Sequence, residues 1–143
     1  MIKLLMIIAI MSKGAPVASK EVISDGHKCM AKVLAHEARY EPLEGRRAIV
    51  ALVLNRARQD WKRVCAVVAQ KGQFPGVLNT PLPEKRSEIW FDVMSNGSGG
   101  AFMNATHYHN SSVRPYWSRQ FEYLGKKGNH LFYRAENENY ARN

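Results

Sequence analysis

The stretch KVLAHEARYEPLEGRRAIVALVLNR, residues 32–56, predicts two consecutive helices that meet at a proline. Apolar residues recur close to the helical period over residues 22–40, which predicts a first helix with these members on one face: Met30, Val33, Leu34 and Ala38. Because the residue before a proline avoids the α conformation, this helix should end by Pro42, which also suits the first turn of the next helix. The second helix is expected over residues 43–59, and its segment 48–54 is apolar on every side, as in a helix buried in a small core.

The rest of the chain predicts further helices and then a small β region. We expect a short helix over residues 63–70, a loop at residues 72–76, and another helix over residues 84–94. Residues 105–110 and 130–134 are short, aromatic and alternating, which is typical of strands. Helices followed by a small β region near the C-terminal end indicate a compact, mainly helical α+β domain.

Length and charge narrow the class of protein. A chain of 143 residues suits one domain, and its 45% apolar residues exclude a largely disordered or collagen-like molecule. It carries 21 Lys and Arg against 12 Asp and Glu, a net charge of +9. Such a balance favours anionic surroundings: nucleic acid, a membrane surface or an acidic cell-wall polymer. Charge alone does not distinguish these partners.

The first residues resemble an export signal. A short basic start at residues 1–3 is followed by an apolar run over residues 4–11 and by small residues up to Ala18. We therefore expect a signal peptide over residues 1–18 and a single working domain over residues 19–143. The apolar run is too short to span a bilayer, which needs about 20 residues. Cys29 and Cys65 would then lie in an oxidising compartment, where they either form a disulfide or remain buried thiols.

Two carboxylates near the end of the first helix are candidates for acid–base chemistry. Glu37 and Glu41 are four residues apart and would project from one helix face if the helix persists that far. A glutamate between alanines beside a helix end can be partly buried, as a general acid requires. The alternative is an ordinary surface helix on which both carboxylates are solvated.

A second group of candidates lies in the predicted strands. His107 and His109 share one strand face, and with His130 and a glutamate they could ligate zinc, as in a wall amidase or peptidase. The sequence has no HExxH pattern, so a polar wall that holds a sugar or peptide is the alternative. Pairs of basic residues occur along the chain without any zinc-finger, helix-turn-helix or RNA-binding motif, and no nucleic-acid partner is expected.

Taken together, six segments resemble one family in the same order. They are residues 36–45 (HEARYEPLEG), 51–56 (ALVLNR), 64–68 (VCAVV) with Gln73 and Phe74, 105–109 (ATHYH), 113–117 (VRPYW) and 128–133 (GNHLFY). The family is that of the cell-wall hydrolases typified by the spore-cortex-lytic enzymes of the SleB type. The resemblance extends from about Cys29 to Arg134, nearly the whole predicted mature chain.

The resemblance implies a lysozyme-like domain that cleaves peptidoglycan between N-acetylmuramic acid and N-acetylglucosamine, as a lytic transglycosylase that leaves a 1,6-anhydro end. It implies that Glu37 is the catalytic acid, and it favours a disulfide between Cys29 and Cys65. We expect no metal or other cofactor, a monomer, and a secreted or periplasmic location at the cell wall. The residues expected to bind substrate are Glu41, Gln73, Phe74, Thr106, His107, Tyr108 and Tyr133.

Two departures from the family pattern bear on sugar recognition. The family usually has glycine where this chain has Tyr40, and serine after the Gln-Phe pair where this chain has Pro75. The alternatives are a zinc-dependent wall amidase or peptidase and a non-catalytic basic module that binds wall polymer or nucleic acid. The setting, whether bacterial wall remodelling, spore germination or phage lysis, is left open, although the compact form suits a phage endolysin.

Overall fold

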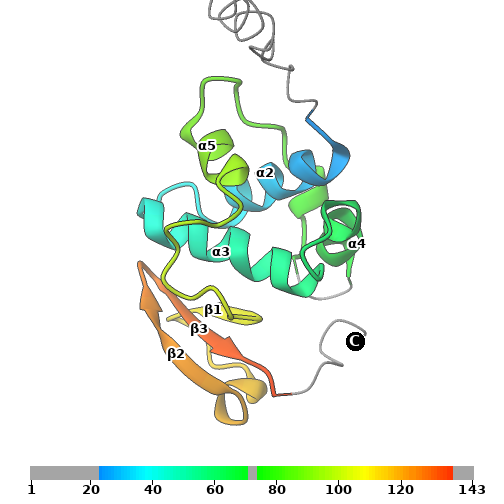
Figure 1. Cartoon of the computed structure of the whole chain (residues 1–143). Coiled ribbons are helices and arrows are strands. Elements are labelled where there is room, and N and C mark those ends of the chain that lie inside the picture. The colour runs from blue at the N-terminus through cyan, green and yellow to red at the C-terminus, as the bar shows by residue number, and fades with distance from the viewer. Residues whose placement is uncertain (1–22, 71–73, 137–143) are drawn as a thin grey trace, which may run out of the picture.

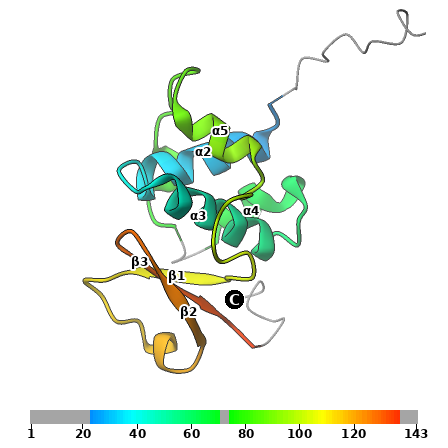
Figure 2. The same ribbon diagram turned by 60° about the vertical axis from the view of Figure 1, so that its left-hand side comes forward.

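The structure, a computed structural model, describes residues 23–70 and 74–136. The helices are α2 (Asp25–Glu37), α3 (Leu43–Arg56), α4 (Val64–Ala69) and α5 (Glu88–Met94), with short 3-10 helices η1 (Trp61–Arg63), η2 (Val77–Asn79) and η3 (Tyr116–Arg119). The strands are β1 (His107–Asn110), β2 (Glu122–Lys127) and β3 (His130–Arg134). Helices form one layer and a three-stranded sheet the other (Figures 1 and 2), which confirms the predicted α+β class. The predicted signal peptide lies outside the described residues.

Helix α2 is shorter at its C-terminal end than the sequence predicted. Its start is capped by Ser24, whose side chain accepts a hydrogen bond from the backbone N–H of His27. It ends at Glu37, and the Ala38 N–H makes the closing bond to the carbonyl of Leu34. Residues 39–41 then form a tight turn that leads into Pro42. Glu41 is therefore not on the helix, and the expectation that the two glutamates share a helix face is wrong, because the chain turns before the proline.

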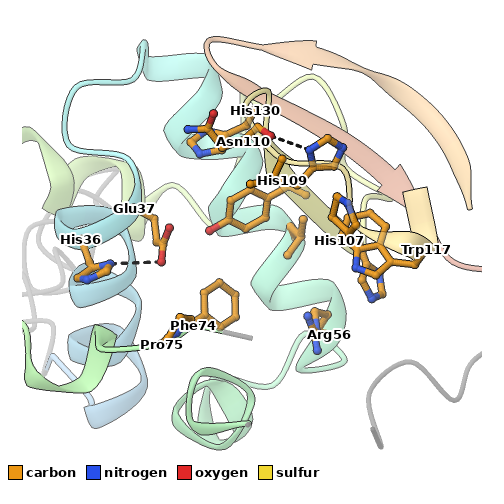
Figure 3. Close-up of a pocket in the computed structure, with 14 residues that line it drawn as sticks. His36, Glu37, Arg56, Phe74, Pro75, His107, His109, Asn110, Trp117 and His130 are labelled. Atoms are coloured by element: carbon orange, nitrogen blue, oxygen red, sulfur yellow. Dashed lines mark hydrogen bonds and ion pairs between the residues drawn. The ribbon is translucent and has the colours of Figure 1, made fainter. Parts of the chain in front are cut away.

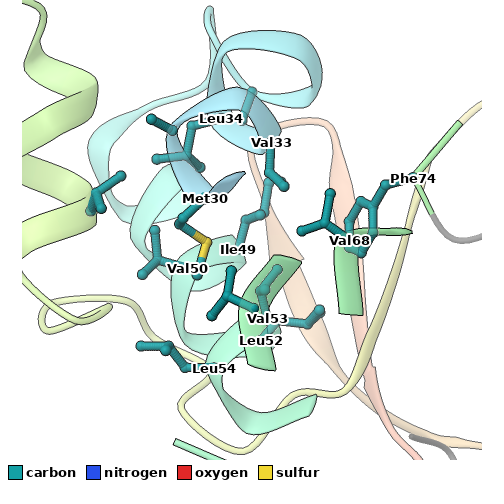
Figure 4. Close-up of a cluster of buried hydrophobic side chains, with 14 of the residues drawn as sticks. Met30, Val33, Leu34, Ile49, Val50, Leu52, Val53, Leu54, Val68 and Phe74 are labelled. Atoms are coloured by element: carbon teal, nitrogen blue, oxygen red, sulfur yellow. The ribbon is translucent and has the colours of Figure 1, made fainter. Parts of the chain in front are cut away.

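Helix α3 is the centre of the core, as its apolar run predicted. Every residue from 48 to 54 is buried, and Figure 4 shows Ile49, Val50 and Val53 of α3 close to Met30 of α2. Fully burying each such side chain contributes about 1.5–3 kcal/mol before the entropy cost of folding is subtracted. The helix ends at Arg56 rather than residue 59, because Arg58 and Gln59 adopt left-handed φ angles of 56° and 61°.

The remaining helices pack around this pair. Helix α4 begins one residue later than predicted, after the 3-10 turn η1, and the disulfide between Cys29 and Cys65 ties it to α2. Helix α5 begins at Glu88, four residues later than predicted, because the Ser87 side chain caps it by accepting from the Ile89 N–H. The loop after α5 crosses directly over α3. A Cβ added at Gly97 would lie 2.7 Å from the backbone nitrogen of Ala51, so only glycine allows this approach.

The sheet has the order β1-β3-β2 and is antiparallel throughout. Strands β1 and β3 match the two predicted strand segments, but β2 was not predicted. Its sequence, EYLGKK, has no apolar alternation, and it is an edge strand that pairs with β3 through the turn at Gly128 and Asn129. No helix in the described ranges is long and apolar enough to cross a membrane.

Candidate active site

A cleft of about 630 Å³ separates the helices from the sheet. Its helical wall comes from the C-terminal ends of α2 and α3, and its other wall from β1 and the segment that follows it (Figure 3). Phe74 and Pro75 close one side. The lining residues are His36, Glu37, Leu52, Arg56, Phe74, Pro75, His107, Tyr108, His109, Asn110, Val113, Pro115, Trp117 and His130.

Glu37 is the last residue of α2 and extends into this cleft (Figure 3). Its side chain is 25% exposed, so the carboxyl is largely shielded yet open to a substrate. The Nδ1 atom of His36 lies 3.2 Å from Glu37 Oε1 and restrains the carboxyl from the solvent side. The α2 helix is itself held by the apolar core, so a rigid element positions this acid.

Glu37 also marks the boundary between the cleft and a second cavity. We call this second cavity, of about 510 Å³, the side cavity; His36 and Glu37 line both. The side cavity is also lined by Tyr40, whose ring is 95% exposed, and by Thr80 and Asn129. A chain-like substrate can therefore extend to both sides of the Glu37 carboxyl.

Tyr108 lies across the cleft from this carboxyl and is enclosed by rings. Its centroid is 6.3 Å from that of Phe74, 5.9 Å from Phe132 and 5.0 Å from His130. Burial raises the pKa of the Tyr108 phenol well above its ordinary value; the Glu37 carboxylate raises it further and Arg56 opposes it. The hydroxyl therefore keeps its proton and can donate a hydrogen bond inside the cleft.

Glu41 is only 9% exposed and lines the side cavity, not the cleft. Its carboxyl accepts hydrogen bonds from the Asn129 N–H at 3.3 and 3.1 Å, and its Oε1 is 3.2 Å from His130 Nδ1. A Cβ added at Gly128 would overlap this carboxyl, so glycine permits the contact. Burial lowers the pKa of His130, with His109 acting in the same direction and the two carboxylates Glu41 and Glu37 opposing. Among the described residues, Glu37 is thus the one carboxylate that lines the cleft.

His107 forms the far wall with Trp117, at 5.0 Å between ring centroids, and its ring also packs at 4.7 Å against Phe121, which does not line the cleft. Its Nδ1 lies 3.0 Å from the hydroxyl of Thr106. Burial, together with the positive charge of Arg56, lowers the pKa of His107 to about 4. The imidazole is neutral at physiological pH and can offer a donor or an acceptor to a sugar.

His109 is buried and fixed at both ring nitrogens. Its Nδ1 lies 2.7 Å from the Asn110 carbonyl and so carries the proton, while its Nε2 lies 3.0 Å from the Tyr133 hydroxyl and accepts from it. Burial raises the pKa of Tyr133, which keeps that hydroxyl protonated. Over residues 23–70 and 74–136, no three metal-ligating side chains are grouped as a metal site would require.

The structure brings together part of the predicted set. Glu37, Phe74, His107 and Tyr108 line the cleft. Glu41, Thr106 and Tyr133 do not line it, but each contacts a histidine that does. Thr106 is buried and its hydroxyl also accepts from the Ala135 N–H at 2.8 Å. Gln73 lies outside the described residues.

Arg56 and Trp117 are cleft residues that the sequence analysis did not propose for the site. Both belong to segments that resemble the family, and this resemblance was the signal in the sequence that could have indicated them as site residues. Arg56 is buried at the end of α3 and binds Gln70 Oε1 at 2.8 Å. Trp117 is on η3, which no periodic pattern predicted.

Comparison with known proteins identifies the family and similar folds. The family model described as Cell Wall Hydrolase matches residues 40–133, a range that begins just after Glu37. The catalytic domain of the germination-specific lytic transglycosylase SleB from Bacillus anthracis is similar, with 23% identity and a TM-score of 0.66, over 81% of this chain and 99% of that one. The catalytic domain of the Bacillus cereus SleB protein has 23% identity and a TM-score of 0.65, over 85% and 99%. No curated protein sequence matches the chain.

Proposed function

The chain belongs to the cell wall hydrolase family, and from this premise we propose that it cleaves the glycan strands of peptidoglycan as a lytic transglycosylase in which Glu37 is the only acid–base residue. The observation that carries the proposal is that one carboxylate lines the cleft in the described part of the chain. The fold is that of the SleB catalytic domains, one of which bears the name of a lytic transglycosylase. That likeness supports the choice of reaction.

A single carboxylate suits transglycosylation better than hydrolysis. Glycosidases that use water generally need two carboxyl groups, about 5–5.5 Å apart for retention and about 6.5–9.5 Å apart for inversion. Glu41 is the nearest candidate in sequence, but it does not line the cleft: its carboxyl accepts a hydrogen bond from the Asn129 N–H and lies 3.2 Å from His130 Nδ1. A transglycosylase needs no activated water, because the 6-hydroxyl of the muramic sugar is the nucleophile.

The reaction then uses one carboxyl group twice, first as an acid and then as a base. Protonated Glu37 donates its proton to the glycosidic oxygen as the C1–O bond breaks, which releases the N-acetylglucosamine side with a free hydroxyl. Positive charge develops at C1, beside the carboxylate that now remains. The 6-hydroxyl attacks C1, and Glu37 takes back the proton of that hydroxyl. The products are a 1,6-anhydro-muramic end and the enzyme in its starting state.

The other cleft residues bind and orient the sugars. Phe74 and Trp117 offer ring faces, and the neutral Tyr108 and His107 offer hydrogen bonds to hydroxyl and N-acetyl groups. We assign Glu41, Thr106 and Tyr133 to positioning, since each contacts a cleft histidine. Gln73 stays a predicted substrate-binding residue. In the side cavity, the exposed ring of Tyr40 is a surface on which a further sugar can stack.

The setting we propose is the cell wall, outside the cytoplasm. The disulfide between Cys29 and Cys65 is typical of secreted and periplasmic proteins, and the net charge of +9 favours an anionic polymer. Export through the signal over residues 1–18, action as a monomer and a role as an endolysin belong to this proposal.

Mass spectrometry of fragments released from purified sacculi tests the function. We expect fragments with 1,6-anhydro ends, in amounts that a chelator does not change. Reducing ends would instead show hydrolysis, and freed stem peptides would show an amidase or peptidase. Binding to sacculi without any released fragment would support the non-catalytic alternative.

A further inference from the structure

A cavity of about 430 Å³ lies on the face of the sheet turned away from the helices. We call it the outer pocket; its lining includes Arg114, Arg119, Tyr123, Lys126, Leu131 and Tyr133. Residues from all three strands contribute, and the segment between β1 and β2 forms its rim. None of the reaction steps above uses it.

The outer pocket has an unbalanced positive charge. Arg114, Arg119 and Lys126 line it, and no acidic residue in the described part of the chain does. Neighbouring cations on the same hairpin are neutralised: Lys127 pairs with Glu44 at 3.1 Å and Arg134 with Glu122 at 3.1 Å. The three cations of the outer pocket form no such ion pair with any described residue. Converging charges of one sign in a concavity attract an anionic group.

The same pocket also offers apolar surface. Tyr123 is 54% exposed and packs against the buried Tyr133, with ring centroids 5.3 Å apart, and Val113 and Leu131 add aliphatic surface. A pocket that combines cations with apolar walls suits an organic acid with a carbon skeleton, such as a short peptide with free carboxylates.

The outer pocket adjoins the cleft. His109 and Val113 line both cavities, and His109 is held in place by the Asn110 carbonyl and the Tyr133 hydroxyl. A single layer of side chains therefore separates the sugar-binding cleft from the cationic pocket. A substituent on a sugar in the cleft can pass over the β1 edge and reach it.

We propose that the outer pocket binds a carboxylate of the peptide stem that muramic acid residues carry. The inference rests on the proposed function, since it takes the glycan strand to lie in the cleft. Arg114, Arg119 and Lys126 bind the carboxylate, while the exposed ring of Tyr123 contacts the peptide carbon atoms. The enzyme then distinguishes glycan that carries peptides from bare glycan.

The test measures binding rather than cleavage. In a Glu37→Gln background, the triple variant Arg114→Ala, Arg119→Ala, Lys126→Ala is co-sedimented with sacculi freed of secondary wall polymers, and with the same sacculi after an amidase has removed the peptides. We expect about tenfold weaker binding to peptide-bearing sacculi and no change on peptide-free glycan. The matched control removes three exposed cations outside both cavities: Lys62→Ala, Lys85→Ala, Arg86→Ala. It should bind both substrates like the parent.

Other outcomes overturn the proposal. Equal loss on both substrates would mean that the cations attract the wall in general, and no loss on either would mean that the pocket is unused. A loss seen only with walls that retain phosphodiester polymers would identify phosphate as the ligand. A variant with Arg114→Lys and Arg119→Lys keeps the charge and should retain most binding, which separates charge from folding. Because nothing is cleaved, the result stands even if wild-type protein releases no anhydro fragments.

Discussion

The two walls of the cleft are built on different physical principles. The helical wall is an apolar core, with residues 48–54 of α3 buried, and it presents one acid, Glu37, at the end of α2. The sheet wall contains three histidines and several aromatic rings, joined through hydrogen bonds and ring contacts. Packing of apolar side chains holds the first wall, and neutral polar groups hold the second.

The difference separates chemistry from recognition. A catalytic acid must be held rigidly, and an apolar helix pair does this without depending on protonation. Sugars are recognised by donors, acceptors and ring faces, which the sheet supplies. Because burial keeps His107 and His130 of the sheet wall neutral, the stability that these residues contribute falls as the pH drops below the ordinary pKa of histidine.

The largest effect is expected when the acid on the helical wall is replaced. Glu37→Gln should lower turnover about 10³-fold, equivalent to ~4 kcal/mol, because the amide cannot donate and recover the proton. Affinity for sacculi and the melting temperature should stay close to wild type, since among the described residues the Glu37 side chain makes a hydrogen bond only with the adjacent His36. Rates of muropeptide release measure the effect. Glu84→Gln, an exposed carboxylate outside the cleft, is the control, and equal activity in the two variants would contradict the role of Glu37.

The next effect tests the packing of the helical wall. Replacing Cys29 and Cys65 together by alanine should lower the free energy of unfolding by about 3 kcal/mol, because the bridge closes a loop between residues 36 apart. Turnover of the folded protein should not change, since neither sulfur lines the cleft. Urea titration of the variant, and of reduced wild type as a control, measures this. A decrease of less than about 1 kcal/mol in the free energy of unfolding would mean that the disulfide does not stabilise the fold. A loss of turnover at temperatures where the variant is folded would mean that the disulfide also supports catalysis.

A third effect probes the pH dependence of the sheet wall. Burial and Arg56 lower the pKa of His107 to about 4, against 6.5 unfolded. Between these values the unfolded chain binds a proton that the folded chain does not, so stability falls as pH drops through the window. Above pH 6.5 and below pH 4 this group has no further effect.

We expect His107 to account for a loss of about 2 kcal/mol across that window, somewhat less than full burial would give, because the ring is partly exposed to water. Urea titrations at several pH values measure the free energy of unfolding. In His107→Gln, its decrease between pH 6.5 and pH 4 should be smaller than in the wild type by the contribution of His107. The lowered pKa of His130 leaves a residual slope of the same sign. An unchanged slope in the variant would contradict the prediction.

The smallest effect concerns a recognition residue on the helical side. Tyr40→Ala should raise KM about fivefold, or ~1 kcal/mol, with kcat unchanged, because the exposed ring stacks on a sugar in the side cavity. Tyr40→Phe keeps the ring and should restore KM. Tyr116→Ala, which removes another highly exposed ring that lines neither the cleft nor the side cavity, is the control. If the two alanine variants behave alike, the ring of Tyr40 binds no sugar.

The sequence predicted the helical wall better than the sheet wall. The apolar run over residues 48–54 can only be buried, so α3 followed directly from it. The end of α3 at Arg56 did not, because it depends on left-handed residues that are not glycine. Strand β2 was missed because its pairing comes from the turn before β3 and not from its own composition.

The site shows the same contrast. Glu37 was a candidate from its place beside a helix end, and only the family resemblance made it the favoured acid. The contact between Glu41 and His130 joins residues distant in the chain, so no local pattern could indicate it. The hydrogen bond from Tyr133 to His109 depends on the strand register. Sequence therefore identifies which residues can act, and tertiary contacts decide which of them face the substrate.

The most direct test of the central claim, that one carboxylate transfers a proton without an attacking water, is digestion of purified sacculi in ¹⁸O-labelled water followed by mass spectrometry of the fragments. We predict that the wild type releases fragments with 1,6-anhydro ends and no incorporated label. Glu37→Gln should release neither anhydro ends nor labelled reducing ends. Reducing ends that carry one ¹⁸O atom would show that water attacks the sugar, and would contradict the single-carboxylate mechanism.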